Sequence, residues 1–254
     1  MNSTINKARS MLVTGGGRGI GAATALRCAQ QGWFVALNYV RDSVAAQSMV
    51  ARIQADGGQA MAIQADVSNE AQVLAMFARI DAELPPLGGL VNNAGVVDFT
   101  ARLDQMNLAR LQRMFSINVF GAFMCAREAV KRMSTRHGGH GGVIVNLSSA
   151  AARLGAAAQY IDYAASKGAI DSFTVGLAKE VALEGIRVNA VRPGIIDTEM
   201  HASGGEPERS RRMAPMVPMQ RAGSADEVAQ AIMWLLSDAS SYTTGAVLDV
   251  TAGR

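Results

Sequence analysis

The sequence predicts an α/β fold built on one doubly wound, seven-stranded parallel sheet with helices on both faces. Short apolar segments of strand length alternate with longer segments of helical periodicity along the 254 residues. The first apolar segment runs into a glycine-rich turn that opens directly into a helical pattern. Because the alternation is unbroken and the length suits one large core, residues 1–254 are expected to form a single domain.

Each expected element is bounded by turn or capping residues. The strands are expected at residues 11–14, 33–39, 60–65, 89–92, 143–147, 187–191 and 246–250. The helices are expected at residues 20–31, 43–55, 69–84, 104–134, 159–184 and 224–236. Ser68 is the expected N-cap of the third helix, Pro85 follows its end, and Ser224 and Glu227 form a capping box at the last helix.

The composition excludes several classes of protein. Hydrophobic residues make up 49% of the chain and charged residues 18%, which is usual for a globular protein. The net charge is only +3 and the basic residues are spread along the chain, so no nucleic-acid partner is expected. The densest basic group, Arg209, Arg211 and Arg212, is interpreted as the solvated face of a helix.

The expected location follows from the cysteines and the apolar segments. Cys28 and Cys125 fall in apolar helical patterns, so no disulfide framework is expected and a reducing compartment fits. Residues 1–10 are polar and lack the apolar region of a secretory signal. No uncharged apolar segment approaches the length of a membrane span, so we expect a cytoplasmic protein without a membrane partner.

The turn after the first strand, Gly15-Gly16-Gly17-Arg18-Gly19-Ile20-Gly21, predicts a phosphate-binding site. Glycines let the backbone approach a pyrophosphate, and the free N–H groups of the following helix favour its charge. Glycine-rich turns are common, so the prediction depends on the position of this turn between a buried strand and a helix.

The end of the second strand indicates which dinucleotide would be bound. In dinucleotide folds an acidic residue there binds the free 2′-hydroxyl of the adenine ribose. Here the strand ends at Tyr39 and no carboxylate occurs before Asp42. Arg18 and Arg41 are candidates to bind a 2′-phosphate, which favours NADP over NAD, although both arginines also fit an exposed surface.

Polar side chains follow the later strands, at the sheet edge where ligands bind. Asn92 and Asn93 end the fourth strand, and Ser148 and Ser149 follow the fifth. No histidine or aspartate follows in a triad arrangement, which disfavours a serine hydrolase.

Tyr163 and Lys167 lie four residues apart in the expected helix 159–184, and so on one face of it. A nearby cation lowers the pKa of a phenol, which suits a general acid and base near neutral pH. Taken alone the pair reads as an ordinary solvated helix face, and only the surrounding motifs favour catalysis.

Three further segments carry weaker signals. Asn118, inside the expected helix 104–134, indicates a kink or a buried hydrogen bond. His137 and His140 lie among glycines without cysteine or carboxylate ligands, so this segment is interpreted as a flexible loop and no metal site is expected. Residues 198–222, with four methionines and several glycines and prolines, are interpreted as a substrate-binding loop or lid.

Together the motifs closely resemble the short-chain dehydrogenase/reductase family over essentially the whole chain. The matching positions are Thr14-Gly15-x-x-x-Gly19-x-Gly21, Asp66-Val67, Asn92-Asn93-Ala94-Gly95, Asn118, Ser149, Tyr163-x-x-x-Lys167 and Pro193-Gly194. The resemblance, which includes the glucose-dehydrogenase-like and 3-oxoacyl-carrier-protein-reductase-like members, implies a Rossmann-type domain. It also implies an oxidoreductase that transfers hydride between a nicotinamide and the carbonyl or secondary alcohol of a small molecule.

The resemblance further implies roles for single residues. Tyr163 would be the proton donor or base, Lys167 would lower its pKa and bind the nicotinamide ribose, and Ser149 would hydrogen-bond the substrate oxygen. Asn118 would help to hold a water beside Lys167 for proton relay. The residues implied to contact the cofactor, most of them by the motifs, are Gly15, Arg18, Gly19, Ile20, Gly21, Tyr39, Arg41, Asp66, Val67, Asn93, Ala94, Gly95, Tyr163, Lys167, Pro193, Gly194, Ile196 and Thr198.

One departure from the family pattern concerns the serine. The family usually places it thirteen residues before the tyrosine, whereas Ser149 precedes Tyr163 by fourteen. An extra residue in the loop 150–162 explains the difference most simply, and Ser148 stays a second candidate. The pocket wall near Arg153 and Tyr160 is therefore expected to differ from close relatives.

The resemblance also implies a homotetramer, or a homodimer, formed through the helices that carry Asn118 and Tyr163. The small residues Gly168, Ala169 and Gly176 are compatible with such an interface. The alternative to an NADP-dependent enzyme is a dinucleotide-sensing or scaffold protein without turnover. Such a protein would be expected to lack the tyrosine or the lysine, both of which are present.

Overall fold

The central sheet organises the molecule, which is a computed structural model describing residues 9–254. Seven strands pair in parallel in the order β3-β2-β1-β4-β5-β6-β9. Their bounds are β1 Ser10–Val13, β2 Phe34–Tyr39, β3 Gln59–Gln64, β4 Leu87–Asn92, β5 Gly142–Leu147, β6 Ile186–Pro193 and β9 Val247–Val250. The expected doubly wound sheet is thus confirmed, and its order reverses between β1 and β4, where ligands bind in such sheets.

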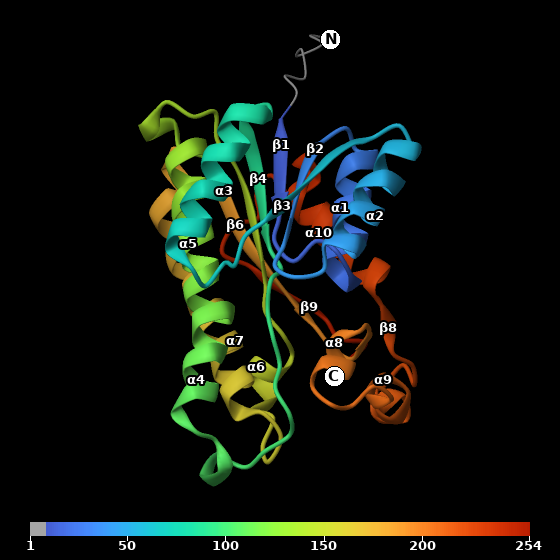
Figure 1. The fold of residues 1–254 in the computed structure, drawn as a ribbon. Helices are drawn as coiled ribbons and strands as arrows, with labels where there is room; N and C mark the ends of the chain where they lie inside the picture. Colours follow the sequence, from blue (N-terminus) through green and yellow to red (C-terminus); the bar gives the residue numbers. More distant parts are fainter. Residues whose placement is uncertain (1–8) are drawn as a thin grey trace.

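Helices cover both faces of the sheet (Figure 1). One face carries α1 Gly19–Gln30, α2 Ser43–Ala55 and α10 Ala225–Leu236, and the other carries α3 Glu70–Glu83, α5 Gly121–Met133 and α7 Ile161–Val181. Side chains alternate across β1, so Met11 and Val13 pack into one core and Leu12 into the other. Within residues 9–254, no helix combines the length and the apolar character needed to cross a bilayer.

The helix expected at residues 104–134 is divided in the structure. A 3₁₀ turn at Leu103–Gln105 precedes α4 Leu108–Phe115, a π-helical turn at Ser116–Phe120 follows, and only then does α5 begin. Asn118 lies in the π-helical turn, where its side chain bonds the backbone of Val96. The chain is thus helical from Leu108 to Met133 with one wide turn at Asn118, the position at which the sequence indicated a kink or a buried hydrogen bond.

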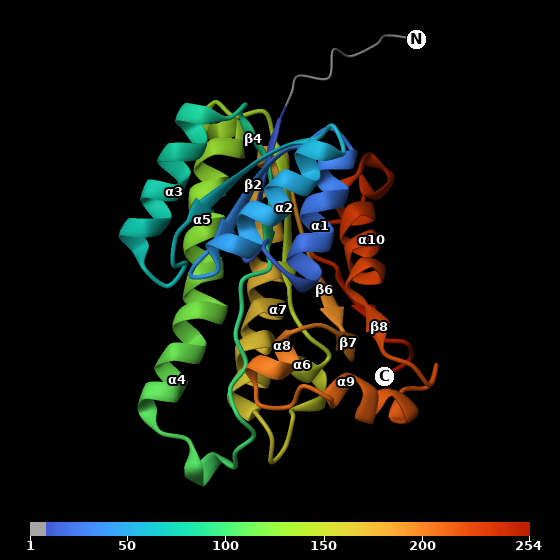
Figure 2. The ribbon, with the colours of Figure 1, turned by 45° about the vertical axis from the view of Figure 1, so that its right-hand side comes forward.

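A layer of short elements lies beyond the carboxyl ends of the strands (Figure 2). These elements are α6 Ala151–Leu154, α8 Met200–Ser203, α9 Arg209–Met213 and the small sheet of β7 Ile196–Asp197 and β8 Gly223–Ser224. Much of the segment 198–222, expected to be a loop, is therefore ordered into short helices. Further 3₁₀ turns lie at Thr135–His137, Ala182–Glu184, Ala214–Met216 and Asp238–Ser240.

Helix ends follow the local signals with one exception. The capping box is confirmed, because Ser224 Oγ accepts from Glu227 N and Glu227 Oε2 accepts from Ser224 N. Asn69 rather than Ser68 caps α3, because Ser68 Oγ is bonded to Asp66 at 2.6 Å. The polar segment 1–10, expected to carry no secretory signal, lies outside the described residues except for its last two positions.

Candidate active site

The glycine-rich turn connects β1 to α1 and leaves the start of that helix open. Gly15 adopts a φ of 63°, and a Cβ on Gly21 would lie 2.4 Å from the carbonyl oxygen of Gly15. No side chain caps α1 and no acidic residue lies in its first turn. Its first N–H groups therefore have no capping side chain, which fits the binding of a pyrophosphate.

Two asparagines hold this turn against the sheet. Asn93 Nδ2 donates to the carbonyls of Thr14 at 2.9 Å and Gly15 at 3.0 Å, at the switch point between β1 and β4. Asn38 Oδ1 accepts from Gly15 N at 3.3 Å, and its Nδ2 donates to Ala65 O at 2.8 Å. Asn38 was missed as a site residue, although an amide in an apolar strand was a visible signal.

The end of β2 carries the residues expected to discriminate between NAD and NADP. Arg18 and Arg41 are exposed, and within residues 9–254 neither makes an ion pair. The nearest carboxylate along the chain, Asp42, caps α2 by accepting from Ala45 N at 2.9 Å. Asp66, at the end of β3, is bonded to Ser68. The carboxylate of Asp42 is thus engaged by backbone, while neither guanidinium is paired with a carboxylate and Arg18 Nη2 donates only a long hydrogen bond of 3.4 Å to Ser203 Oγ.

Tyr163, Lys167 and Ser149 meet in one cavity. Tyr163 and Lys167 lie on one face of α7, as their spacing indicates, and Lys167 Nζ donates to Leu147 O at 2.6 Å. The Ser149 hydroxyl lies near the Tyr163 phenol and lowers its pKa. Ser148 instead points its hydroxyl at the carbonyl of Lys167, 3.2 Å away. The geometry therefore favours Ser149 over Ser148.

Burial sets the charges of the two titratable groups. It raises the pKa of Tyr163 to about 12, and the nearby Ser149 hydroxyl opposes this rise only in part. The expected lowering of this pKa by Lys167 was therefore wrong, because the effect of burial dominates. Burial also lowers the pKa of Lys167 to about 8. Tyr163 is therefore a neutral phenol at neutral pH, ready to donate a proton.

Asn118 links the end of β4 to α7. Its Oδ1 accepts from Val96 N at 2.8 Å, while its Nδ2 donates to Val96 O at 2.9 Å and to Ser166 Oγ at 3.1 Å. A Cβ on Gly95 would lie 3.3 Å from Asn118 Oδ1 and 3.6 Å from Lys167 Nζ. Asn118 is thus close to Lys167, but its side chain is occupied by protein partners.

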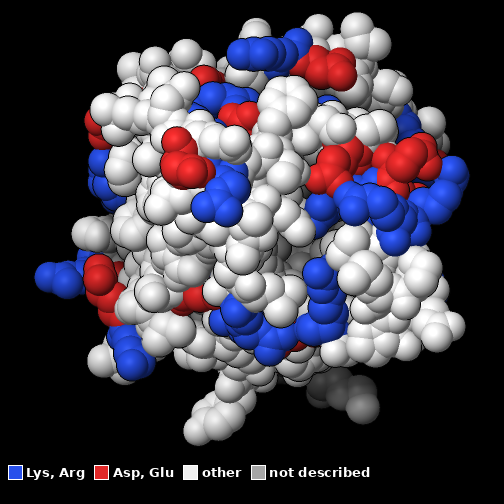
Figure 3. Space-filling model, turned by 90° about the horizontal axis from the view of Figure 1, so that it is seen from below, with Lys and Arg blue, Asp and Glu red and all other residues white. Residues whose placement is uncertain are grey.

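The cavity has a volume of about 400 Å³ and opens beyond the carboxyl ends of the strands. Besides the three residues above, its walls include predicted cofactor contacts, namely Ile20, Asn93, Pro193, Gly194, Ile196 and Thr198. The other predicted contacts lie in the glycine turn or at the ends of β2, β3 and β4. Figure 3 shows the face seen from below, where basic side chains lie beside a central hollow.

Sequence reasoning missed three residues that line this cavity, His201, Arg209 and Arg254. Arg209 also corrects an expectation, because it is buried rather than part of a solvated helix face, whereas Arg211 and Arg212 are exposed. Near the same wall, Ala156 and Ala158 adopt positive φ angles of 48° and 55°. This stretch of backbone belongs to the loop 150–162 that was expected to depart from the family pattern.

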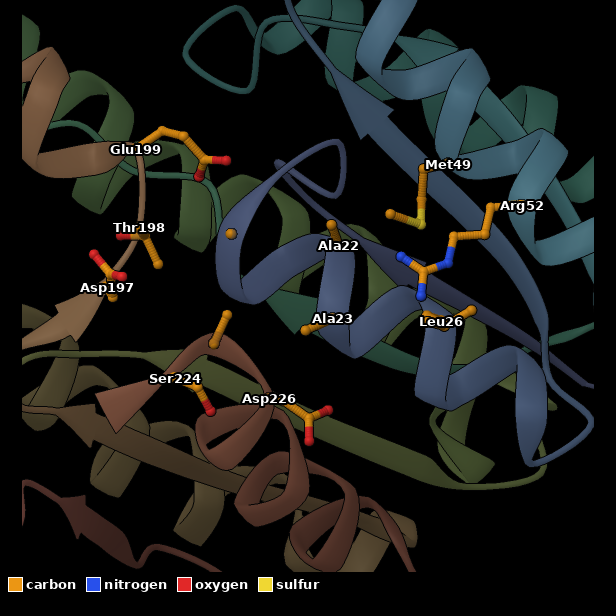
Figure 4. A pocket seen from close by; sticks show the side chains of 12 residues that line it. Ala22, Ala23, Leu26, Met49, Arg52, Asp197, Thr198, Glu199, Ser224 and Asp226 are labelled. Carbon is orange, nitrogen blue, oxygen red and sulfur yellow. The ribbon is translucent and has the colours of Figure 1, made fainter. Parts of the chain in front are cut away.

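A second and more open hollow, of about 720 Å³, lies on the outer surface of α1 (Figure 4). Met49 and Arg52 of α2 stand on one side of it, and Thr198, Glu199 and Asp226 on the other. Tyr163, Lys167 and Ser149 do not line it, so it is separate from the candidate reaction centre.

Comparison with known proteins places the chain in a family. A family model described as "Enoyl-(Acyl carrier protein) reductase" matches residues 15–254. The "Uncharacterized oxidoreductase YgfF" of Escherichia coli is 56% identical over 243 residues, covering 96% of this chain and 98% of that protein. A 3-oxoacyl-[acyl-carrier-protein] reductase of Synechocystis is 39% identical over 255 residues, covering 97% of this chain and 96% of that protein.

Solved structures agree with the sequence relatives. A short chain dehydrogenase from Burkholderia cenocepacia in complex with NADP has a TM-score of 0.88 and 33% identity, covering 96% of this chain and 97% of its own. A blue fluorescent protein from a metagenomic library in complex with NADPH has a TM-score of 0.87 and 34% identity, with the same coverage. The chain therefore belongs to the short-chain dehydrogenase/reductase family and is an oxidoreductase that acts on CH–OH or C=O groups with NAD(P).

Proposed function

We propose that the protein is an NADP-dependent oxidoreductase of a small carbonyl compound or secondary alcohol, with Tyr163 as its general acid and base. The observation that carries the proposal is the meeting of Tyr163, Ser149 and Lys167 in one cavity beside the open start of α1. The bound nicotinamide supplies or accepts the hydride. The substrate oxygen lies between the Tyr163 phenol and the Ser149 hydroxyl, where both can hydrogen-bond it.

In reduction, the neutral phenol of Tyr163 gives its proton to the carbonyl oxygen while Ser149 stabilises the developing charge. Lys167 stands behind the phenol as the cation that favours the resulting phenolate, and it binds the nicotinamide ribose. Asn118 keeps the segment around Gly95 in place beside Lys167. Because its side chain is committed to Val96 and Ser166, any water that Asn118 holds is bound by its backbone.

The preference for NADP rests on the end of β2. Tyr39 stands where an acidic residue would bind a free 2′-hydroxyl, and the carboxylate of Asp42 is used as a helix cap. Arg18 and Arg41 are exposed cations on either side of this point. An arginine presents several donors that match a phosphate group.

The test follows NADPH and NADH consumption over ketones, 3-oxoacyl thioesters and quinones, and the reverse reaction over sugars and secondary alcohols. Turnover with NADPH should exceed that with NADH. Arg41→Ala should lower kcat/KM for NADPH about tenfold, since a hydrogen bond to a charged group is lost, and should leave the value for NADH unchanged. Arg136→Ala, which removes another exposed arginine, is the control. A clear preference of the native protein for NADH would overturn the cofactor assignment.

We further propose that the protein is a homotetramer or homodimer formed through α5 and α7. Phe120 and Phe123 are exposed, and Phe123 stacks on Phe173 of α7 with 3.8 Å between ring centroids. A Cβ added to Gly168 or Gly176 would meet no atom within 4 Å. An apolar face of this kind is typical of an interface between subunits.

A further inference from the structure

We infer that the substrate carries a carboxylate, which the cavity binds through Arg209 at the end remote from the reacting carbonyl. This inference rests on the proposed function and specifies its substrate class. Among residues 9–254, the cavity is lined by three cationic side chains, Lys167, Arg209 and Arg254, and by no aspartate or glutamate. The hollow on α1 differs, because Asp197, Glu199 and Asp226 line it. A cavity whose lining side chains carry an excess of positive charge attracts a ligand of negative charge.

Arg209 is fixed in place by its neighbours. Only 7% of the residue is exposed, its Nη2 donates to Gln159 Oε1 at 2.8 Å, and its Nη1 lies 3.2 Å from Glu206 Oε1. Its guanidinium also lies over the ring of Tyr160, 5.0 Å from the centroid. A buried arginine held in one orientation presents its remaining donors as a planar fork, which suits a carboxylate.

The charge of Arg209 is only partly neutralised. Glu206 is the one carboxylate within ion-pair distance of it in the described chain, and Glu206 is shared with Arg212 and accepts a further hydrogen bond from Thr100. The single negative charge of Glu206 is thus shared between the guanidinium groups of Arg209 and Arg212. Arg209 therefore has only a share of one counter-ion, and a substrate anion would complete the neutralisation of its charge.

Arg209 is also placed to orient a substrate toward the phenol. The ring of Tyr160 contacts both groups, since it lies under the Arg209 guanidinium and 5.9 Å from the Tyr163 ring in an edge-on arrangement. Ala150, Ala151 and Ala157 also line the cavity. A keto acid bound in this way would have its carbonyl at Tyr163, its carboxylate at Arg209 and its apolar chain against the alanines.

The experiment measures kcat/KM for the NADPH-dependent reduction of keto acids of increasing chain length. The value for each acid is compared with the value for its methyl ester. For the best chain length, the native protein should prefer the acid to its ester by about tenfold or more, since the ester lacks the charged hydrogen bond. Arg209→Gln should remove this preference by lowering the value for the acid while that for the ester changes little. Arg211→Gln is the matched control, because Arg211 lies on the same helix with its side chain exposed.

Three outcomes would overturn the inference while leaving the proposed function intact. These are an ester preference in the native protein, an acid preference that survives in Arg209→Gln, and an equal loss of acid and ester turnover in that variant, which would show a purely structural role. Arg209→Lys, which keeps the charge, should retain part of the acid preference if Arg209→Gln fails to fold. If no carbonyl compound is reduced with NADPH or NADH, the proposed function fails first.

Discussion

Tyr163 and Lys167 are both buried, and burial favours the neutral form of each because water no longer solvates the charge. It raises the pKa of Tyr163 to about 12 and lowers that of Lys167 to about 8. The phenol of Tyr163 therefore keeps its proton over the whole neutral pH range. The charge of Lys167 changes near pH 8, just above that range. A perturbed pair of this kind inside a cavity is typical of a catalytic site.

The low pKa of Lys167 predicts a pH dependence of stability. Between about pH 8 and its ordinary value of 10.5, the unfolded state binds more protons than the folded state, so the free energy of unfolding rises with pH. Lys167→Met lacks this contribution. From pH 7 to about pH 9.5 the native protein should gain about 1–2 kcal/mol relative to the variant, measured by urea unfolding. A constant difference between the two would contradict the burial of the lysine.

Single residues were predictable only where a motif contains them. Tyr163, Lys167 and Ser149 stand in spacings that carry chemistry, and the structure brings these three together. Arg209 belongs to no motif and was interpreted as solvated, because its neighbours Arg211 and Arg212 are charged. Its burial depends on Tyr160 and Gln159, some fifty positions earlier in the chain, and no local pattern reports such a contact.

The first turn of α7, which carries Tyr163, is anchored to α4 by a buried ion pair. Arg110 Nε donates to Asp162 Oδ2 at 2.8 Å, and Arg110 Nη1 donates to the carbonyl of Phe99 at 2.7 Å. The side chain of Asp162 is fully buried, and 12% of that of Arg110 is exposed. The pair ties α4, α7 and the loop after β4 together directly beside the phenol.

Asp162→Asn should destabilise the protein by about 3–5 kcal/mol, because it leaves the buried Arg110 charge without its counter-ion. Urea unfolding at neutral pH measures the change. Asp104→Asn is the matched control, since the Arg102–Asp104 pair is largely exposed, and it should cost less than about 1 kcal/mol. Equal effects of the two substitutions would refute the anchoring role.

Elements were predictable where one pattern persists through the segment. Strands such as β5 and β6 are apolar runs bounded by glycine or polar residues, and their expected positions differ from the structure by a few residues at most. The helix expected at 104–134 is present from Leu108 to Met133, but the apolar pattern did not reveal that its turn at Ser116–Phe120 is π-helical. The short helix α8 was missed because it is about one turn long, whereas a helix was expected around Arg209, Arg211 and Arg212, where α9 lies.

The topology of the whole molecule explains why residues far apart in sequence share one cavity. Parallel strands end at the same edge, so the segments after β1, β4, β5 and β6 converge there, and α6, α8 and α9 close over them (Figure 2). This could be predicted from the alternation of strands and helices. The shape of the substrate end could not, because it is formed by short segments without a periodic pattern.

The proposed assembly gives a prediction at this scale. Phe120→Glu should reduce the molar mass in solution by disrupting the interface of α5 and α7, since a charge would be buried against an apolar partner face. Light scattering after size-exclusion chromatography measures it. Val44→Glu on α2, where the side chain is 79% exposed, is the control and should leave the mass unchanged. A native protein that is already monomeric would refute the assembly.

The most direct test of the central claim compares the native protein with Tyr163→Phe for NADPH binding and for turnover. The substitution removes one hydroxyl group and leaves the ring in place. The account predicts that the dissociation constant for NADPH is unchanged, while kcat for carbonyl reduction falls by about 100-fold or more, the usual loss when a general acid is removed. Turnover close to the native rate in the variant would contradict the role of Tyr163 as the proton donor.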